Sequence, residues 1–292
     1  MTSAERNQRP AMANNIPAAG AERRAQARTA SEQWKTALTS IAPNKILIRG
    51  YPVDELMGRL SFADAVYLLL MGELPSPAIG RMLNALLVST LDHGVTPPST
   101  LATRNVATSG APLKDCVAAG ILAFGRYHGD IESCMRFLDA GLTLVRGGHT
   151  FQQAADSLVS ECVRTGQAPP GFGHRFHSRD PRAARLFQMA LELELEGEHV
   201  RLVRAIERVL EARQQEVGRL HPINVDGAIA AISADLGFAY DLGHAIFLIS
   251  RLPGLIAHAH EERSRQQPMR QIDPKDHEYD GSRERRLPET RK

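Results

Sequence analysis

Apolar residues recur at three- and four-residue spacing along most of the chain, which is the period of an amphipathic helix. The first such stretch covers 56–70, and Gly72 follows it as a stop signal. A second stretch covers 77–91 and has Pro77 at its start. A third stretch, 116–124, is apolar nearly all round and therefore predicts a helix buried on every side.

The same spacing continues to the C-terminal part of the chain. It predicts helices at 131–146, 150–165, 181–196, 198–217, 226–237 and 242–259. The helix near 181 has a clear start, because Asp180 can cap the free amides and Pro181 fits the first turn. Only 45–48 (KILI) predicts a strand, and no period of 20 to 50 residues repeats. The pattern predicts an all-α fold.

The two ends of the chain differ from the middle. Residues 1–30 are rich in Ala, Arg, Asn, Gln and Pro, so they cannot bury enough apolar surface to offset their ordering entropy. We expect them to form a disordered arm. The region after 261 is dense in Arg, Glu, Asp and Pro, and its last part, 281–292, is expected to be a mobile tail.

Composition excludes some classes of function. The 292 residues are 43% hydrophobic and 23% charged, as in an ordinary globular protein. A net charge of +2 and interleaved acidic and basic residues argue against nucleic acid as a partner, and 5% aromatic content argues against base stacking. We expect no membrane segment, because no apolar run approaches about 18 residues. Three scattered cysteines without a CxxC pair, and no secretory signal, predict reduced thiols and a cytoplasmic location.

Four segments concentrate glycine, proline, histidine and charge between apolar helices, where functional groups are commonly held. They read DHGVTPPST (92–100), GRYHGDIE (125–132), PPGFGHRFHSRDPR (169–182) and HPINVDG (221–227). In the third, Gly171 and Gly173 allow close approach of a ligand to the backbone, and His174 suits proton transfer near neutral pH. A glycine turn with surface histidines explains this segment equally well.

Several charged residues have both a structural and a functional interpretation. Asp180 and Arg182 can hold an anion at a helix start or can simply cap it, and Asp226 can likewise be a cap. His128 can be a satisfied core residue. Arg251 lies in an otherwise apolar helix, so it needs a carboxylate partner or an anionic ligand. Together these types suit a base for an acidic C–H bond, donors for an oxyanion and clamps for carboxylates.

A metal-dependent hydrolase is an alternative, with His93, His128 and His174 as ligands. The sequence has no HExxH motif or other tight ligand spacing, so we expect no metal site.

The segments, taken in order, resemble the citrate synthase superfamily from about residue 46 to residue 279. The matching stretches are ILIRGYPVDELMGRLSFADAVYLLLMGELPS (46–76), DHG…PST, the HG segment, GFGHR…DPRA, NVD and ISRLPGLIAHAHEE (249–262). The resemblance implies an all-helical homodimer or higher homo-oligomer, with an active-site cleft between a large, N-terminally shortened domain (31–145 and 226–280) and a small domain (146–225).

The resemblance also implies roles for individual residues. Asp226 would abstract the methyl proton of acetyl-CoA, His128 would hydrogen-bond the enolate, and His174 would donate to the oxaloacetate carbonyl. The carboxylates of the substrate would be held by His93, Arg182, Arg251 and, across the dimer interface, Arg270. The CoA nucleotide would lie against Pro170, Gly171, Phe172 and Gly173.

Short forms of this kind resemble citryl-CoA lyase, which uses the same site in reverse to cleave citryl-CoA to acetyl-CoA and oxaloacetate. In that direction His174 would accept the hydroxyl proton and Asp226 would reprotonate the enol. The resemblance implies an acyl-CoA and a 2-oxo dicarboxylic acid as partners, with the CoA thioester as a substrate and no permanently bound cofactor. The alternatives are a citrate synthase, a 2-methylcitrate synthase-type acyltransferase, or a non-catalytic homologue that binds CoA or an oxo acid.

One motif departs from the family. The family usually shows two glycines after the histidine, whereas here Gly129 is followed by Asp130. A carboxylate beside an enolate site opposes the developing negative charge unless it points away.

Overall fold

The computed structural model describes residues 35–174, 177–217 and 221–287. The predicted arm at 1–30 and the end of the predicted tail at 281–292 lie outside the described residues.

Helices make up most of the described chain, as predicted. They are α2 (Val53–Leu56), α3 (Phe62–Met71), α4 (Pro77–Ser89), α5 (Pro98–Ala107), α6 (Leu113–Leu122), α7 (Ile131–Arg146), α8 (Phe151–Thr165), α9 (Pro181–Glu192), α10 (Glu198–Ala212), α11 (Gln214–Val217), α12 (Val225–Asp235), α13 (Tyr240–Arg265) and the 3-10 helix η1 (Pro274–Asp276). The strands are β1 (Thr39–Ala42), β2 (Lys45–Ile48) and β3 (Tyr51–Pro52).

The structure corrects several helix boundaries. The helix predicted at 56–70 begins only at Phe62, because Ser61 and Asp64 form a capping box there. Its predicted end is confirmed, since Gly72 takes a left-handed conformation with φ 90°. The segment 92–100 was expected to lie between helices, yet α5 begins within it at Pro98. The buried face of α5 consists largely of serine and threonine, so no apolar period marks it.

The chain also forms more strand than predicted. The strand at 45–48 is confirmed as β2, but β1 and β3 pair with it on either side in a small antiparallel sheet. The register places Ile41 opposite Ile46 and Ile48 opposite Tyr51. Asn44 makes the turn between β1 and β2 with φ 59°, a conformation that Asn tolerates. The sheet is too short to change the all-α class.

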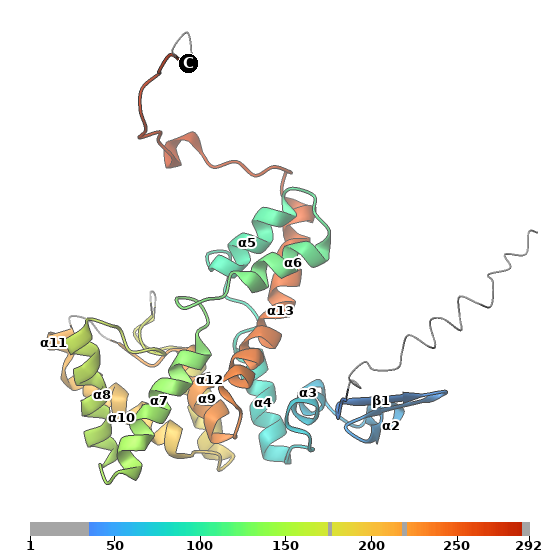
Figure 1. Ribbon diagram of the computed structural model, residues 1–292, viewed down its shortest axis with the longest axis vertical. Helices are drawn as coiled ribbons and strands as arrows, with labels where there is room; N and C mark the ends of the chain where they lie inside the picture. The colour runs from blue at the N-terminus through green and yellow to red at the C-terminus, as the bar shows by residue number, and fades with distance from the viewer. Residues whose placement is uncertain (1–34, 175–176, 218–220, 288–292) are drawn as a thin grey trace, which may run out of the picture.

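The main core is a layer of helices around α12. Helices α7, α8 and α10 pack on one another, and α7, α9, α10 and α13 contact α12. The largest fully buried side chains include Leu138, Leu142, Ile206, Leu210 and Ile229. Figure 1 shows α7 to α12 gathered in one lobe, α5 and α6 beside the far end of α13, and the sheet at the opposite side. The predicted domain boundaries remain a prediction.

The prediction that 116–124 is buried on every side is wrong for the single chain. Within α6 only Cys116 and Gly120 are buried, and Leu122 is 83% exposed. Gly120 lies against α5 and α13, where an added Cβ would come within 2.9 Å of Leu255 Cδ1. The helix therefore uses one narrow face for packing and leaves its other apolar face open.

Helix α13 is the longest helix, with 26 residues. Contrary to expectation, it is long and apolar enough to cross a membrane by length and composition alone. Half of the apolar window is buried inside the fold, and a core helix passes the same test, so this is weak evidence for a membrane span. In the structure α13 is the element that joins α4, α5, α6, α7 and α12.

Candidate active site

A cavity of about 580 Å³ lies where the four glycine- and histidine-rich segments meet. It brings together most of the residues predicted from the sequence, namely His93, His128, Gly173, His174, Arg182, Asp226 and Arg251. A larger groove of about 1050 Å³ between α4 and α9 shares only Arg182 with this cavity and has no histidine among its lining residues. The smaller cavity is therefore the candidate active site.

Backbone pairing brings the third and fourth segments together. The amide of Gly173 donates to the carbonyl of Pro222 over 2.8 Å, and the amide of Asn224 donates to the carbonyl of Gly171 over 3.1 Å. The Asn224 side chain then caps α12 by accepting from the amide of Gly227 over 3.1 Å. This pairing sets the loop that carries a histidine beside the first turn of α12.

Gly171 and Phe172 serve packing rather than lining the cavity. Gly171 has φ +83°, and an added Cβ would lie 2.7 Å from the Cα of Gly227 and 2.6 Å from the Sγ of Cys134. Phe172 is 7% exposed and forms part of the core. Of the four residues expected to contact the nucleotide, only Gly173 lines the cavity. The nucleotide contact of Pro170, Gly171 and Phe172 remains a prediction.

Asp226 lies in the first turn of α12, facing the cavity. Its pKa is raised to about 6: burial raises it most, Arg182 and Arg251 oppose this, and the carboxylates of Asp180 and Asp130 also raise it. A carboxyl group with this pKa holds or releases a proton near neutral pH, as a general acid or base must.

Asp180 is both a helix cap and a bridge. It accepts from the amide of Arg182 over 3.0 Å at the start of α9 and from the amide of Val225 over 3.0 Å at the start of α12. The Arg182 guanidinium grips the same carboxylate through Nε at 2.9 Å and Nη2 at 2.8 Å. Burial opposes ionisation of Asp180, but Arg182 and these amides outweigh burial and lower its pKa. Asp180 therefore stays ionised and orients Arg182 on the cavity wall.

His93 and His174 face each other across the cavity, with ring centroids 5.7 Å apart and nearly perpendicular. Partial burial lowers the pKa of both; Arg182 and Arg251 add to the effect at His93, and His177 adds to it at His174. The amide of His177 donates to His174 Nδ1 over 3.1 Å, which leaves the ring proton of the neutral form on Nε2. His174 is thus set up to donate to a carbonyl oxygen.

His128 is a cavity residue and not a buried core histidine. Its Nε2 lies 2.8 Å from Ser99 Oγ, and its ring stacks on Phe124 at 4.8 Å between centroids. A tight turn, in which the His128 amide donates to the Gly125 carbonyl over 2.8 Å, holds the backbone. These contacts fix the orientation of the imidazole.

The departure at Gly129 and Asp130 has a local explanation. Gly129 takes φ +75°, and an added Cβ would lie 2.6 Å from the ring of Phe247. The Asp130 carboxylate accepts from the amide of Ser133 over 3.1 Å and so caps α7. Asp130 still raises the pKa of Asp226, which favours the protonated form of that group.

Arg251 is the least satisfied charged group on the cavity wall. It is 2% exposed; its Nε donates to the Thr90 carbonyl over 2.8 Å, and its guanidinium lies 5.3 Å from the centre of the Phe247 ring. Nη1 is buried without a hydrogen-bond partner, and the side chain forms no ion pair with any residue that the structure describes. Burial lowers the pKa of Arg251, although Asp92 and Asp226 oppose this. An anionic ligand in the cavity would satisfy it.

Arg270 lies outside the cavity of its own chain. Its Nε and Nη2 donate to Glu262 over 3.0 Å and 2.6 Å, and Glu262 is 1% exposed. Its expected role across a dimer interface remains a prediction. Sequence reasoning did not single out Ser99, Asn224 or Phe247, although Ser99 and Asn224 fall within the segments that it marked.

Comparison with known proteins identifies the family. The family model described as "Citrate synthase, C-terminal domain" matches residues 75–272, which is more than half of the chain. The chain belongs to the citrate synthase family. A citrate synthase of Dictyostelium discoideum is 27% identical over 194 residues, covering 64% of this chain and 36% of that protein. The chain thus spans about a third of the length of this curated relative.

Solved structures of similar proteins agree with this assignment. The structure of citryl-CoA lyase from Hydrogenobacter thermophilus matches with a TM-score of 0.78 and 42% identity, covering 88% of this chain and 98% of that chain. The ATP citrate lyase of Methanosaeta concilii in complex with (3S)-citryl-CoA matches with a TM-score of 0.73, 18% identity, and coverage of 97% of this chain and 47% of that chain. At that identity, the second match shows the shared fold alone.

Proposed function

We propose that this protein is a citryl-CoA lyase, which cleaves citryl-CoA to acetyl-CoA and oxaloacetate. The buried Arg251 guanidinium carries the proposal, because its Nη1 has no hydrogen-bond partner among the residues that the structure describes and it shares a wall with Asp226 and three histidines. Such a wall suits a substrate with several carboxylates and a carbon atom that exchanges a proton. The likeness to the Hydrogenobacter thermophilus lyase, over 98% of that chain, supports the cleaving direction.

The residues of the cavity divide into clamps and proton carriers. Arg251 and Arg182 would bind the carboxylates of the citryl group, and His93 would add a hydrogen bond. The CoA thioester enters as a substrate, not as a permanently bound cofactor. His128, oriented by Ser99, would hydrogen-bond the thioester oxygen as it gains charge, a contribution of roughly 3 kcal/mol to the transition state by analogy with other oxyanion donors.

The reaction moves one proton from oxygen to carbon. The citryl hydroxyl proton passes to Nε2 of His174, which requires the tautomer with the ring proton on Nδ1 instead of the one that the His177 amide favours in the free protein. The bond between the hydroxyl-bearing carbon and the thioester methylene breaks, and its electron pair forms the enolate of acetyl-CoA. Asp226, whose raised pKa keeps part of it protonated, donates its proton to that carbon. Oxaloacetate and acetyl-CoA leave, His174 releases its added proton to solvent, Asp226 takes one up, and no water is consumed.

The test is a coupled assay of the purified protein with citryl-CoA, in which malate dehydrogenase reports oxaloacetate. We expect cleavage that falls at least about 100-fold in Asp226→Asn and in His174→Ala, because each removes a proton carrier. His260→Ala, at an exposed position of α13, serves as the matched control. The same preparations receive acetyl-CoA or propionyl-CoA with oxaloacetate and a thiol reagent. Thiol release without citryl-CoA cleavage would assign a synthase, and binding of CoA without turnover would assign a non-catalytic homologue.

We further propose that the protein is a homodimer, as the family resemblance implies. Helices α6 and α13 pack side by side and expose Leu122, Leu252 and Ile256, of which Leu122 is 83% exposed. A second copy laid on this face would cover them and would account for the apolar character of α6. Light scattering after size exclusion should give twice the chain mass, and Leu122→Glu should give one chain mass. A wild-type monomer that cleaves citryl-CoA would refute the dimer alone.

A cytoplasmic location is likewise proposed, and cell fractionation would test it.

A further inference from the structure

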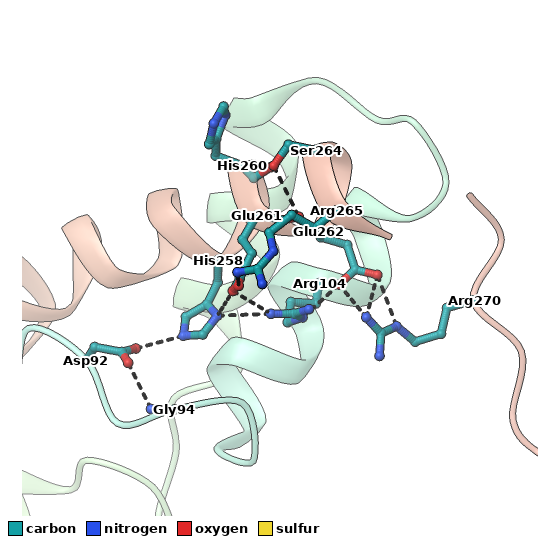
Figure 2. A network of polar contacts seen from close by, with 10 residues as sticks. All are labelled: Asp92, Gly94, Arg104, His258, His260, Glu261, Glu262, Ser264, Arg265 and Arg270. Atoms are coloured by element: carbon teal, nitrogen blue, oxygen red, sulfur yellow. Dashed lines mark hydrogen bonds and ion pairs between the residues drawn. The ribbon is translucent and has the colours of Figure 1, made fainter. Parts of the chain in front are cut away.

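A polar network runs from the cavity loop into the interior of the α5–α13 pair (Figure 2). At its outer end Asp92 Oδ2 accepts from the amide of Gly94 over 2.9 Å, and Asp92 Oδ1 lies 2.9 Å from His258 Nε2. His93 lies between these two loop residues and faces the cavity. The loop 91–96 is exposed throughout and is not helical, so it needs an anchor to hold a side chain in one place.

Arg104 and Asp92 together decide which nitrogen of His258 carries the proton. Its Nη1 lies 3.2 Å from His258 Nδ1. A guanidinium can only donate, so His258 Nδ1 must accept, and the ring proton of the neutral form must lie on Nε2. In this tautomer Nε2 donates to Asp92. The alternative tautomer would place a lone pair against the Asp92 carboxylate and a proton against the guanidinium.

Arg104 is itself rigidly held on the buried side. It is 7% exposed, and its Nε lies 2.7 Å from Glu262 Oε2, a carboxylate that is 1% exposed. Its Nη1 also donates to Glu261 Oε2 over 3.2 Å. Glu262 binds Arg270 as well, so its charge is matched on two sides. Four charged side chains thus form one network on the buried side of His258.

We propose that Arg104 and His258 are positioning residues for His93. Arg104 holds Nδ1 of His258 as an acceptor, His258 donates through Nε2 to Asp92, and Asp92 fixes the turn that presents His93 to the substrate. The proposal rests on the proposed function, because His93 is given its role there as a ligand of the substrate carboxylates. Neither Arg104 nor His258 lines the cavity, so both act only through the loop.

Two amide substitutions at His258 separate its two hydrogen bonds. His258→Gln places an amide nitrogen near the position of Nε2 and keeps the bond to Asp92. His258→Asn places an oxygen near Nδ1, keeps the contact with Arg104, and is too short to reach Asp92. We expect His258→Asn to weaken oxaloacetate binding roughly tenfold in isothermal titration, as loss of a charge-assisted hydrogen bond predicts. His258→Gln should stay within about twofold of the wild type, as should His260→Asn, a matched control on the exposed side of α13.

A double-mutant cycle tests whether the effect passes through His93. In a His93→Ala background, His258→Asn should cause no further loss, because the group that it positions is already gone. An undiminished tenfold loss in that background would overturn the proposal, as would wild-type binding by His258→Asn. If His258→Asn does not fold, Asp92→Asn takes its place, since Asp92 is exposed and tolerates the change more readily.

The role of Arg104 has its own test. Arg104→Met leaves the Asp92 carboxylate alone to select the tautomer of His258 and should weaken oxaloacetate binding, while Glu262 keeps Arg270 as its partner. Adding His258→Gln should restore binding, because an amide needs no tautomer to be set. Failure of this rescue in a folded protein would refute the role of Arg104. A wild-type protein that neither binds oxaloacetate nor cleaves citryl-CoA would instead refute the proposed function itself.

Discussion

Replacing Arg251 with methionine should change affinity and stability in opposite directions. The residue is 2% exposed, and its Nη1 has no hydrogen-bond partner among the described residues. If Nη1 binds a carboxylate of the substrate, its buried charge is satisfied only in the complex. In the free protein the same charge lowers the free energy of unfolding. A residue kept for structure alone would show the opposite behaviour, because its loss would destabilise the fold.

The expected magnitudes follow from the contacts of Arg251. A charge-assisted hydrogen bond contributes about 1.5–3 kcal/mol, so the KM for citryl-CoA should rise roughly 10- to 100-fold in Arg251→Met. The variant also loses the bond from Nε to the Thr90 carbonyl, which costs about 1 kcal/mol. Removing an uncompensated buried charge returns several kcal/mol. The free energy of unfolding should therefore rise by about 1 kcal/mol or more.

The assay pairs urea unfolding, followed by circular dichroism, with the coupled cleavage assay. Arg251→Lys is the matched control: it keeps the charge but loses the planar fork and the bond to Thr90, so it should lose affinity without gaining stability. A fall of about 2 kcal/mol in the free energy of unfolding of Arg251→Met, with an unchanged KM, would refute the reasoning and make Arg251 a structural residue.

Three further predictions concern other parts of the chain. Asp226 must be protonated to complete cleavage, so kcat/KM for citryl-CoA should fall about tenfold per pH unit above about 6. The rate of synthesis should not fall in that range. Identical pH profiles in both directions would contradict this role of Asp226. Burial opposes protonation of His199, but Asp235 and Asp139 outweigh burial and raise its pKa. The contribution of His199 to the free energy of unfolding is therefore full below the ordinary histidine pKa of 6.5 and is lost as pH rises through the raised pKa. Urea unfolding across pH 6–9 should show this free energy declining in the wild type and staying nearly constant in His199→Gln. Gly171→Ala should cost roughly 2–5 kcal/mol in urea unfolding, because Gly171 combines φ +83° with a close backbone approach; loss of CoA affinity at unchanged stability would instead support a direct nucleotide contact.

Local pattern was sufficient where one helix face is apolar. Helix α7 occupies the predicted span 131–146, and α8 begins one residue after its predicted start, because spacing and caps are encoded within a few residues. Helix α5 was not predicted, because its buried face is polar. Strands β1 and β3 were not predicted either, because such short strands depend on pairing with a neighbouring strand. The apolar run of α6 was misread as full burial, because composition does not say which neighbour covers a face.

The candidate site also depends partly on local sequence and partly on the tertiary structure. The residue types and their order along the chain marked His93, His128, His174, Asp226 and Arg251, and the family resemblance assigned them roles. That these five share one cavity is a property of the tertiary structure alone. So are the raised pKa of Asp226 and the unpartnered Nη1 of Arg251, because desolvation depends on atoms from several helices.

Long-range contacts were beyond the reach of sequence spacing altogether. His258 meets Asp92 across 166 positions and Arg104 across 154 positions of the chain. Each of these residues, taken by itself, is an ordinary polar residue on a helix or in a loop. Only the packing of α5 against α13 brings them within hydrogen-bond distance. Each donor then lies opposite one acceptor, and this fixes which atom donates in each hydrogen bond.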